Sequence, residues 1–168
     1  MDISIRELTS KDVVDAAKIH VQTFHDTYQG MMPTERLNAM TDESLIPRWK
    51  DIIETNKVRL ILLGAFVNEE LIGTCSSGTP RSDFGSDSEL WSMNIPRVYQ
   101  RRGAGKLLFN RSIEHLIADG KKSMYLCCID KNLNALAFYR AMGGEITDIS
   151  VEREGYREVI VKWNELKI

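Results

Sequence analysis

The segment from residue 89 to residue 129 constrains the fold most, because a strand, a glycine-bearing turn, a helix and a second strand follow one another without a break. Glu89 to Ile95 has the composition of a strand. YQRRGAGKLLF, residues 99–109, then leads into an apolar helix from Gly103 to Ala118, which Asp119-Gly120 ends. Met124 to Ile129 is the second strand. This order predicts a β-α-β crossover, with the turn at the C-terminal end of a strand, where α/β folds bind ligands.

The periodicity of the whole chain predicts the order β-α-α-β-β-β-α-β-α-β-β. This order implies an α/β (α+β) fold with a central mixed β-sheet flanked by helices on both faces, in a single domain that covers residues 1–168. The elements outside the crossover are a strand at Ile3–Ile5, a helix capped by Thr9 and Asp12, a helix capped by Thr41, a hairpin of Val58–Val67 and Leu71–Ser77, a helix that ends at Gly143-Gly144, and strands at Glu145–Val151 and Glu158–Trp163.

Composition excludes several classes of function. The chain has 22 Lys and Arg against 24 Asp and Glu, a net charge of −2, so we expect no nucleic-acid partner. No N-terminal targeting segment or long apolar run is present in the sequence, and the three cysteines form no CxxC pair. We therefore expect a cytoplasmic protein with no membrane partner. The three histidines lack metal-ligand spacing, so no metal site is predicted.

Two well-known phosphate-binding motifs do not fit the glycine turn. A P-loop requires glycine at the position of Gln100 and Ser or Thr at the position of Leu107. A dinucleotide fingerprint requires a third glycine where Leu108 stands. What remains is Gln100-x-x-Gly103-x-Gly105 at the start of a helix, where free N–H groups and the positive helix end attract an anion. The basic side chains Arg101, Arg102 and Lys106 add to that attraction, although a glycine turn with a solvated basic face fits the same letters.

A second motif decides between these interpretations. Asn132-x-x-Ala135-x-x-Phe138-Tyr139-x-x-x-Gly143 opens the next helix, one strand later. Together, the two motifs and the order of elements resemble the GNAT superfamily of acyl-CoA-dependent N-acetyltransferases over most of the chain. One departure is Gly143-Gly144, where the family usually has Gly-Phe; it removes one packing aromatic.

The resemblance implies acetyl-CoA as the cosubstrate and assigns its contacts. The backbone N–H groups from Arg101 to Lys106 are implied to bind the pyrophosphate, and the pantetheine arm is implied to run along Met93 to Ile95 between parting strands. Asn132 corresponds to the family's cofactor-contacting asparagine. The implied cofactor-binding set is Met93, Asn94, Ile95, Gln100, Arg101, Arg102, Gly103, Ala104, Gly105, Lys106, Asn132, Ala135 and Tyr139.

The resemblance also implies catalytic roles for transfer to a primary amine by direct attack in a ternary complex. Glu89 stands where the histone-type members carry a catalytic glutamate base, and burial against Trp91 is expected to raise its pKa. Tyr139 corresponds to the general acid that protonates the CoA sulfur, and the N–H of Met93 to the group that polarises the thioester carbonyl, commonly at a bulge. The rival interpretations are a solvated strand end for Glu89, since many family members lack a base there, and a core tyrosine with a satisfied hydroxyl for Tyr139.

The acceptor pocket is expected between the first two helices and the loops beyond the central strands. Phe24, Tyr28, Asp83 and Glu89 are the candidate substrate-binding residues, and Asp87 adds to the acidic character of the 79–88 loop. A small cationic amine is therefore the expected acceptor. The alternatives are a non-catalytic acetyl-CoA-binding sensor or scaffold, which needs neither Glu89 nor Tyr139, and a protein or peptide N-acetyltransferase. A homodimer, common in the family, is expected to involve the apolar strand residues 160–163.

Overall fold

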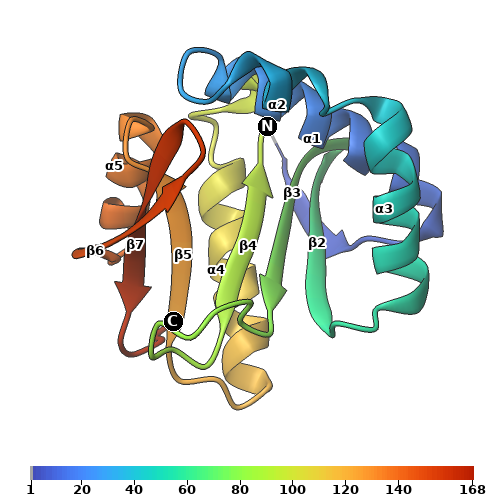
Figure 1. Cartoon of the computed structure of the whole chain (residues 1–168). Coiled ribbons are helices and arrows are strands. Elements are labelled where there is room, and N and C mark those ends of the chain that lie inside the picture. Colours follow the sequence, from blue (N-terminus) through green and yellow to red (C-terminus); the bar gives the residue numbers. More distant parts are fainter. Residues whose placement is uncertain (1) are drawn as a thin grey trace.

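The computed structural model describes residues 2–168 and contains one seven-stranded sheet with the strand order β1-β2-β3-β4-β5-β7-β6 (Figure 1). The strands are β1 (Ser4–Glu7), β2 (Leu60–Val67), β3 (Glu70–Gly78), β4 (Glu89–Asn94), β5 (Met124–Ile129), β6 (Glu145–Arg153) and β7 (Tyr156–Trp163). The helices are α1 (Val13–Tyr28), α2 (Thr34–Asn38), α3 (Asp42–Thr55), α4 (Ala104–Ala118) and α5 (Leu133–Ala141), with short 3-10 turns η1 (Ser10–Asp12) and η2 (Arg97–Tyr99). The mixed sheet predicted from the sequence is confirmed.

β4 and β5 are the one parallel pair in the described sheet, and they separate almost at once. Their ladder has a single register pair, Glu89 opposite Tyr125, near the start of both strands. All other neighbouring strands are antiparallel. Figure 1 shows the two ribbons diverging toward the top of the view. Beyond this first pair, the backbone N–H and C=O groups on the facing edges of β4 and β5 therefore do not bond to each other.

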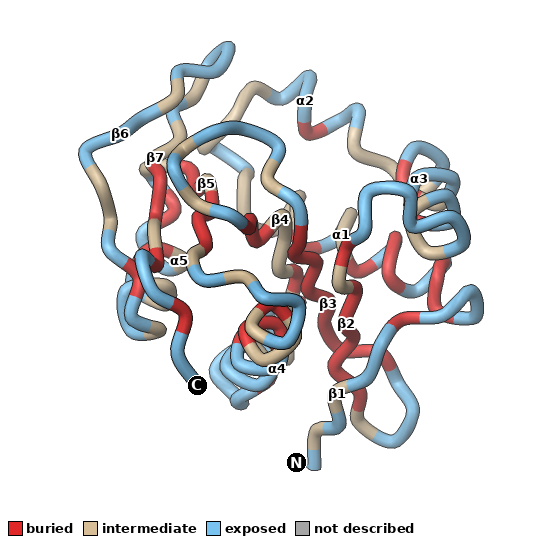
Figure 2. The backbone as a smooth tube through the Cα atoms, turned by 90° about the horizontal axis from the view of Figure 1, so that it is seen from below, coloured by how far each residue is buried: buried red, intermediate tan, exposed pale blue. Residues whose placement is uncertain are grey.

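The two faces of the sheet are covered by different helices. One buried cluster joins α4 and α5 to the sheet through residues such as Leu108, Ile113 and Leu136. The other joins α1 and α3 through residues such as Ala16 and Trp49. Figure 2 shows the buried residues concentrated in the central strands, with β6 and α2 mostly outside the core. Side chains that alternate along β4 consequently face different helices.

A bulge interrupts that alternation in β4. Ser76 of β3 lies opposite Ser92, but the next residue of β3, Ser77, lies opposite Leu90, so Trp91 has no cross-strand partner. Leu90 joins the α4 cluster, whereas Trp91 packs against the α1 and α3 cluster. Ser92 bonds to Ser76 through their hydroxyls at 2.7 Å. The bulge re-aims the strand immediately before Met93.

Two sequence expectations fail in the fold. The segment after residue 33 contains the short helix α2, which the sequence reading did not predict. The proposed contribution of residues 160–163 to a dimer is wrong, because β7 lies between β5 and β6 and Ile160, Val161 and Trp163 are buried within the chain. Across residues 2–168, no helix has both the length and the apolar character required to cross a bilayer.

The entry into α1 is fixed by an ion pair. Arg6 donates two hydrogen bonds to the Asp12 carboxylate, at 2.8 and 3.0 Å, and its guanidinium lies 3.7 Å from the centre of the Phe66 ring. The backbone N–H of Thr9 donates to the same carboxylate at 2.7 Å, as the predicted capping box requires. The hydrogen bonds from Arg6 lower the pKa of Asp12 to about 2. These contacts join β1 to the helix that borders the expected acceptor site.

We predict that Asp12→Asn destabilises the fold at pH 7 by roughly 2 kcal/mol, because ionised Asp12 is more stable in the folded than in the unfolded state. This contribution is present above pH 4 and is lost as the pH falls toward 2, so the difference between wild type and variant should shrink over that range. Urea unfolding at a series of pH values measures it. Asp15→Asn, an exposed change in the same helix, is the control; an equal effect of both variants would contradict the assignment.

Candidate functional site

The turn before α4 presents a row of backbone N–H groups to solvent. Arg101 has φ +60° and Gly103 has φ +96°, so the chain enters the helix through left-handed conformations. The first backbone hydrogen bond of the helix is donated by Leu107 to the carbonyl of Gly103. Among the described residues, the N–H groups of 101–106 find no acceptor. Such a concave array at a helix N-terminus is suited to an anion.

The two glycines of the turn serve different purposes. A Cβ at Gly103 would meet no atom within 4 Å, so the space beside it is open, and its positive φ favours glycine. A Cβ at Gly105 would lie 3.2 Å from Ile95 and 3.5 Å from Phe138, so Gly105 permits close packing of α4 on β4 and α5. Gln100 fixes the turn from the other side, since its Nε2 donates to the carbonyl of Ile95 at 2.8 Å.

The remaining predicted cofactor residues lie at the ends of β4 and at the start of α5. Met93 packs against the α4 cluster, and the buried side chain of Asn94 donates to the hydroxyl of Thr74, its partner on β3. Asn132 is the N-cap of α5, where its Oδ1 accepts from the N–H of Ala135 at 3.2 Å. Its side-chain nitrogen contacts no acceptor among the described residues and is free to donate.

Tyr139 lies on the inward side of α5, between the rings of Phe138 and Trp163. No hydrogen bond joins its hydroxyl to another residue in the described part of the chain, and the side chain is half-buried. Burial, and to a smaller extent the neighbouring Cys128 and Tyr28, raise the pKa of Tyr139 well above its usual value. The hydroxyl therefore keeps its proton throughout the neutral and moderately alkaline range.

The aromatic residues expected at the acceptor site come together on α1. Phe24 and Tyr28 pack edge to face with ring centres 4.9 Å apart, and burial raises the pKa of Tyr28 to about 12. The tip of the β6–β7 hairpin lies against the loop that follows α1, since a Cβ on Gly155 would lie only 2.5 Å from Pro33. The hairpin thus borders the α1 side of the site.

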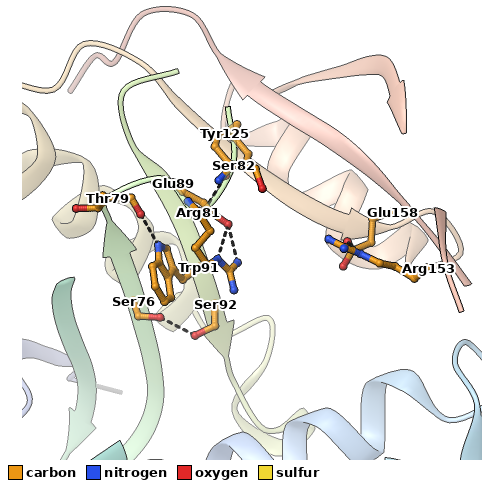
Figure 3. A network of polar contacts seen from close by, with 10 residues as sticks. All are labelled: Ser76, Thr79, Arg81, Ser82, Glu89, Trp91, Ser92, Tyr125, Arg153 and Glu158. Carbon is orange, nitrogen blue, oxygen red and sulfur yellow. Dashed lines mark hydrogen bonds and ion pairs between the residues drawn. The ribbon is translucent and has the colours of Figure 1, made fainter. Parts of the chain in front are cut away.

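Glu89 is almost completely buried, with 1% of its surface exposed, and each of its oxygens accepts two hydrogen bonds (Figure 3). Oε1 accepts from Nε and Nη2 of Arg81 at 3.0 and 2.6 Å. Oε2 accepts from the backbone N–H of Arg81 at 2.7 Å and from the Tyr125 hydroxyl at 2.8 Å. The Arg81 guanidinium also lies over the Trp91 ring, 4.5 Å from its centre. The carboxylate is therefore ion-paired and fully hydrogen-bonded.

Comparison with known proteins places this geometry in a family. The profile of the Acetyltransferase (GNAT) family matches residues 21–143. The chain belongs to this family. YuaI, an uncharacterized N-acetyltransferase of Bacillus subtilis (strain 168), is 30% identical over 172 residues, which cover 98% of this chain and 94% of YuaI. The resemblance inferred from the two motifs is confirmed, and with it the enzyme class, an N-acetyltransferase.

Solved structures share the GNAT fold over nearly the whole chain. PaiA N-acetyltransferase from Thermoplasma acidophilum, in complex with coenzyme A, superimposes with a TM-score of 0.74 at 19% identity, covering 97% of this chain and 100% of its own. YncA from Salmonella typhimurium, with its cofactor acetyl-CoA, has a TM-score of 0.74 at 17% identity and covers 98% of this chain and 94% of its own. The GNAT profile ends at Gly143, and the alignment with YuaI and these structures extends the comparison over β6 and β7.

The three carboxylates expected to attract a cationic acceptor all accept hydrogen bonds from other groups of this GNAT chain. The charge of Glu89 is neutralised by Arg81, whose guanidinium lies over the Trp91 ring. The indole N–H of Trp91 donates to the carbonyl of Thr79. Asp87 accepts hydrogen bonds from the backbone of residues 122 and 123, so it joins two loops. Asp83 is exposed, and its carboxylate accepts from the N–H of Gly85. Of these three carboxylates, only Glu89 forms an ion pair among the described residues, so the cationic acceptor expected from their charge stays a prediction.

Arg81 and Tyr125 are the residues that the sequence reading missed. A usable signal existed for Arg81, because a glutamate inside a strand needs a cation and Arg81 is the one basic residue between Thr79 and Ser88. Nothing in the sequence pointed to Tyr125, because tyrosine is a common residue in strands. Among residues 2–168, no group of three or more His, Cys, Asp or Glu is arranged to hold a metal ion.

Proposed function

We propose that this protein transfers the acetyl group of acetyl-CoA to a primary amine of a small acceptor by direct attack in a ternary complex. The observation that carries the proposal is the combination of the free N–H groups of 101–106 with the parting of β4 and β5 directly before them. PaiA and YncA, which share the fold, were solved with coenzyme A and acetyl-CoA. Their cofactors support the same class of cosubstrate here.

The chain's own residues divide the binding of the cosubstrate between them. The N–H groups of 101–106 and the exposed side chains of Arg101, Arg102 and Lys106 would neutralise the diphosphate. The backbone of Met93 to Ile95 would bond the amides of the pantetheine arm, as an added strand does at a sheet edge. Asn132 would donate from its free amide nitrogen. Bound in this way, the thioester reaches the middle of the sheet near the bulge in β4.

Acetyl transfer develops negative charge on the thioester oxygen and then on the departing sulfur. The N–H of Met93, which follows the bulge, is the proposed donor to the oxygen. Tyr139 is the proposed acid for the sulfur, because its hydroxyl is unpartnered and its raised pKa keeps it protonated. A protonated group inside an apolar wall, as Tyr139 is between Phe138 and Trp163, donates without prior loss of another hydrogen bond.

The attacking amine must lose a proton, and Glu89 is the proposed base. It lies opposite Tyr125, where the two strands begin to part, on the strand that carries Met93. Because both oxygens are occupied by donors, Glu89 accepts a proton only when Arg81 gives up a hydrogen bond to it. The base role therefore requires Arg81 to move when the acceptor binds.

We predict that wild-type protein releases CoA thiol from acetyl-CoA in the presence of an amine acceptor, and that Tyr139→Phe lowers kcat by roughly 100-fold without changing acetyl-CoA affinity. The substitution removes the acid but keeps the ring packing. Thiol release and isothermal titration measure the two effects. Tyr99→Phe, which removes the hydroxyl that donates to Glu70 on the surface, is the control. Unchanged turnover in Tyr139→Phe would remove Tyr139 from the mechanism, and tight acetyl-CoA binding without turnover of any amine would indicate a sensor.

For Glu89→Gln we predict a loss of kcat of at least about 100-fold, because an amide does not accept the amine proton. Arg81→Gln removes the same ion pair but keeps the carboxylate, so its kcat should stay within about tenfold of wild type while its KM for the acceptor rises. Steady-state kinetics of both variants separate the roles. Equal losses of kcat in both would show that Glu89 acts by holding Arg81, which overturns its assignment as the base.

A further inference from the structure

A basic hollow opens beside Arg81, between the loop that leads into β2 and the loop that follows β3. It has a volume of about 310 Å³ and is lined by Lys57, Val58, Arg59, Thr79, Pro80, Arg81 and Trp91. Three of these residues are cationic, and none is acidic. The hollow therefore concentrates positive charge on a protein whose net charge is −2.

The three cations have unused donors. Among the described ion pairs, none involves Lys57 or Arg59, and both side chains are exposed. Arg81 is 50% exposed and uses Nε and Nη2 for Glu89, while its Nη1 has no acceptor in residues 2–168. The Trp91 ring, on which Arg81 lies, holds the guanidinium plane in place. The hollow thus has donors for an anion and an aromatic wall.

The loop that carries Lys57 and Arg59 has a defined conformation. Asn56 ends α3 with φ +40°, and its side chain bonds to both backbone groups of Leu60, at 2.8 and 3.1 Å. Arg59 itself has φ +51°, and its carbonyl lies close to Gly78 at the end of β3. These contacts fix the backbone of the loop on both sides of the two cations.

The hollow is close to the proposed reaction centre. Trp91, which lines it, is two residues before Met93, a separation of about 6–7 Å along a strand. Arg81, another lining residue, bonds directly to the proposed base Glu89. A small molecule whose amine lies at the thioester can therefore place its opposite end in the hollow.

We propose that the hollow binds an anionic group, a carboxylate or a phosphate, that the acceptor carries at the end opposite its amine. This inference rests on the proposed function and names its substrate class: amino acids, short peptides or amino phosphates rather than polyamines. The charge of the hollow, the free donors of Lys57, Arg59 and Arg81, and the neutralised Glu89 carry the proposal.

The contact between the anionic group and Arg81 also explains how Glu89 becomes free to accept a proton. An anionic group within hydrogen-bond distance of Arg81 competes with Glu89 for the Nη2 donor. When Nη2 turns to the acceptor, Oε1 of Glu89 keeps at most one of its two hydrogen bonds and accepts the proton from the amine. Recognition of the anion and activation of the base are then coupled through a single side chain.

The binding test uses two anionic probes, glutarate and inorganic phosphate, and 1,5-diaminopentane as the cationic comparison. The indole N–H signal of Trp91, assigned with Trp91→Phe, is followed by NMR during titration into the protein. We expect a saturable shift with at least one anion and none with the diamine. In the double variant Lys57→Gln and Arg59→Gln the apparent Kd should rise about tenfold or more. The better of the two anions identifies the acceptor group as carboxylate or phosphate.

The matched control is the double variant Lys50→Gln and Arg111→Gln, which removes the same charge from exposed positions on α3 and α4. It should bind the anion like wild type. No shift of Trp91 with either anion, or an equal weakening in both double variants, overturns the proposal.

An activity comparison separates this proposal from the proposed function. Lysine and 1,5-diaminopentane differ only by a carboxylate, so wild type should acetylate lysine with a kcat/KM about tenfold higher, and the preference should vanish in Lys57→Gln and Arg59→Gln. Equal turnover of both amines together with no anion binding overturns the hollow but leaves acetyl transfer intact. Anion binding at Trp91 with no acetylation of any amine supports the hollow as an anion site and overturns the proposed function.

Discussion

The separation of β4 and β5 after one register pair is the constraint on which the site depends. Backbone N–H and C=O groups that leave a ladder need other partners, and a sheet interior offers none. Here the chain leaves these groups facing a gap between strands, directly before a turn whose N–H groups are also free. A ligand with both amide groups and an anion satisfies the two sets together. The open strands and the turn are therefore one binding feature.

The burial of Glu89 is the second constraint on the site. A carboxylate with 1% exposure is stable only if it is paired and hydrogen-bonded, and Arg81 and Tyr125 meet that need. The pairing requires Arg81 to reach in from the 79–88 loop and to lie on Trp91, the residue displaced by the bulge. The bulge thus positions both the Met93 N–H and the support for Arg81. Because Arg81 is half exposed, the link between Glu89 and solvent is the part of the network that an acceptor can change.

The features that sequence predicted are local ones. The glycine turn, the helix it opens and the start of the helix at the Asn132 motif depend on neighbouring residues, and the structure has them at or within one residue of the predicted positions. The features it missed depend on contacts between distant segments. Periodicity does not show that β7 inserts between β5 and β6, that Asp87 joins residues 122 and 123, or that Arg81 reaches Glu89. The charge of an acceptor site depends on such contacts, and for this reason the sequence did not show that Arg81 neutralises Glu89.

Titration of acetyl-CoA into wild type, Gly103→Glu and Gly120→Glu tests the central claim most directly. Both glycines have positive φ and no atom within 4 Å of an added Cβ, so the two substitutions cause similar backbone strain. They differ in place, because Gly103 borders the proposed diphosphate site and Gly120 lies at the other end of α4. Wild type and Gly120→Glu should bind with micromolar Kd, and Gly103→Glu should lose binding. Equal affinity in all three proteins would contradict the placement of the diphosphate on residues 101–106.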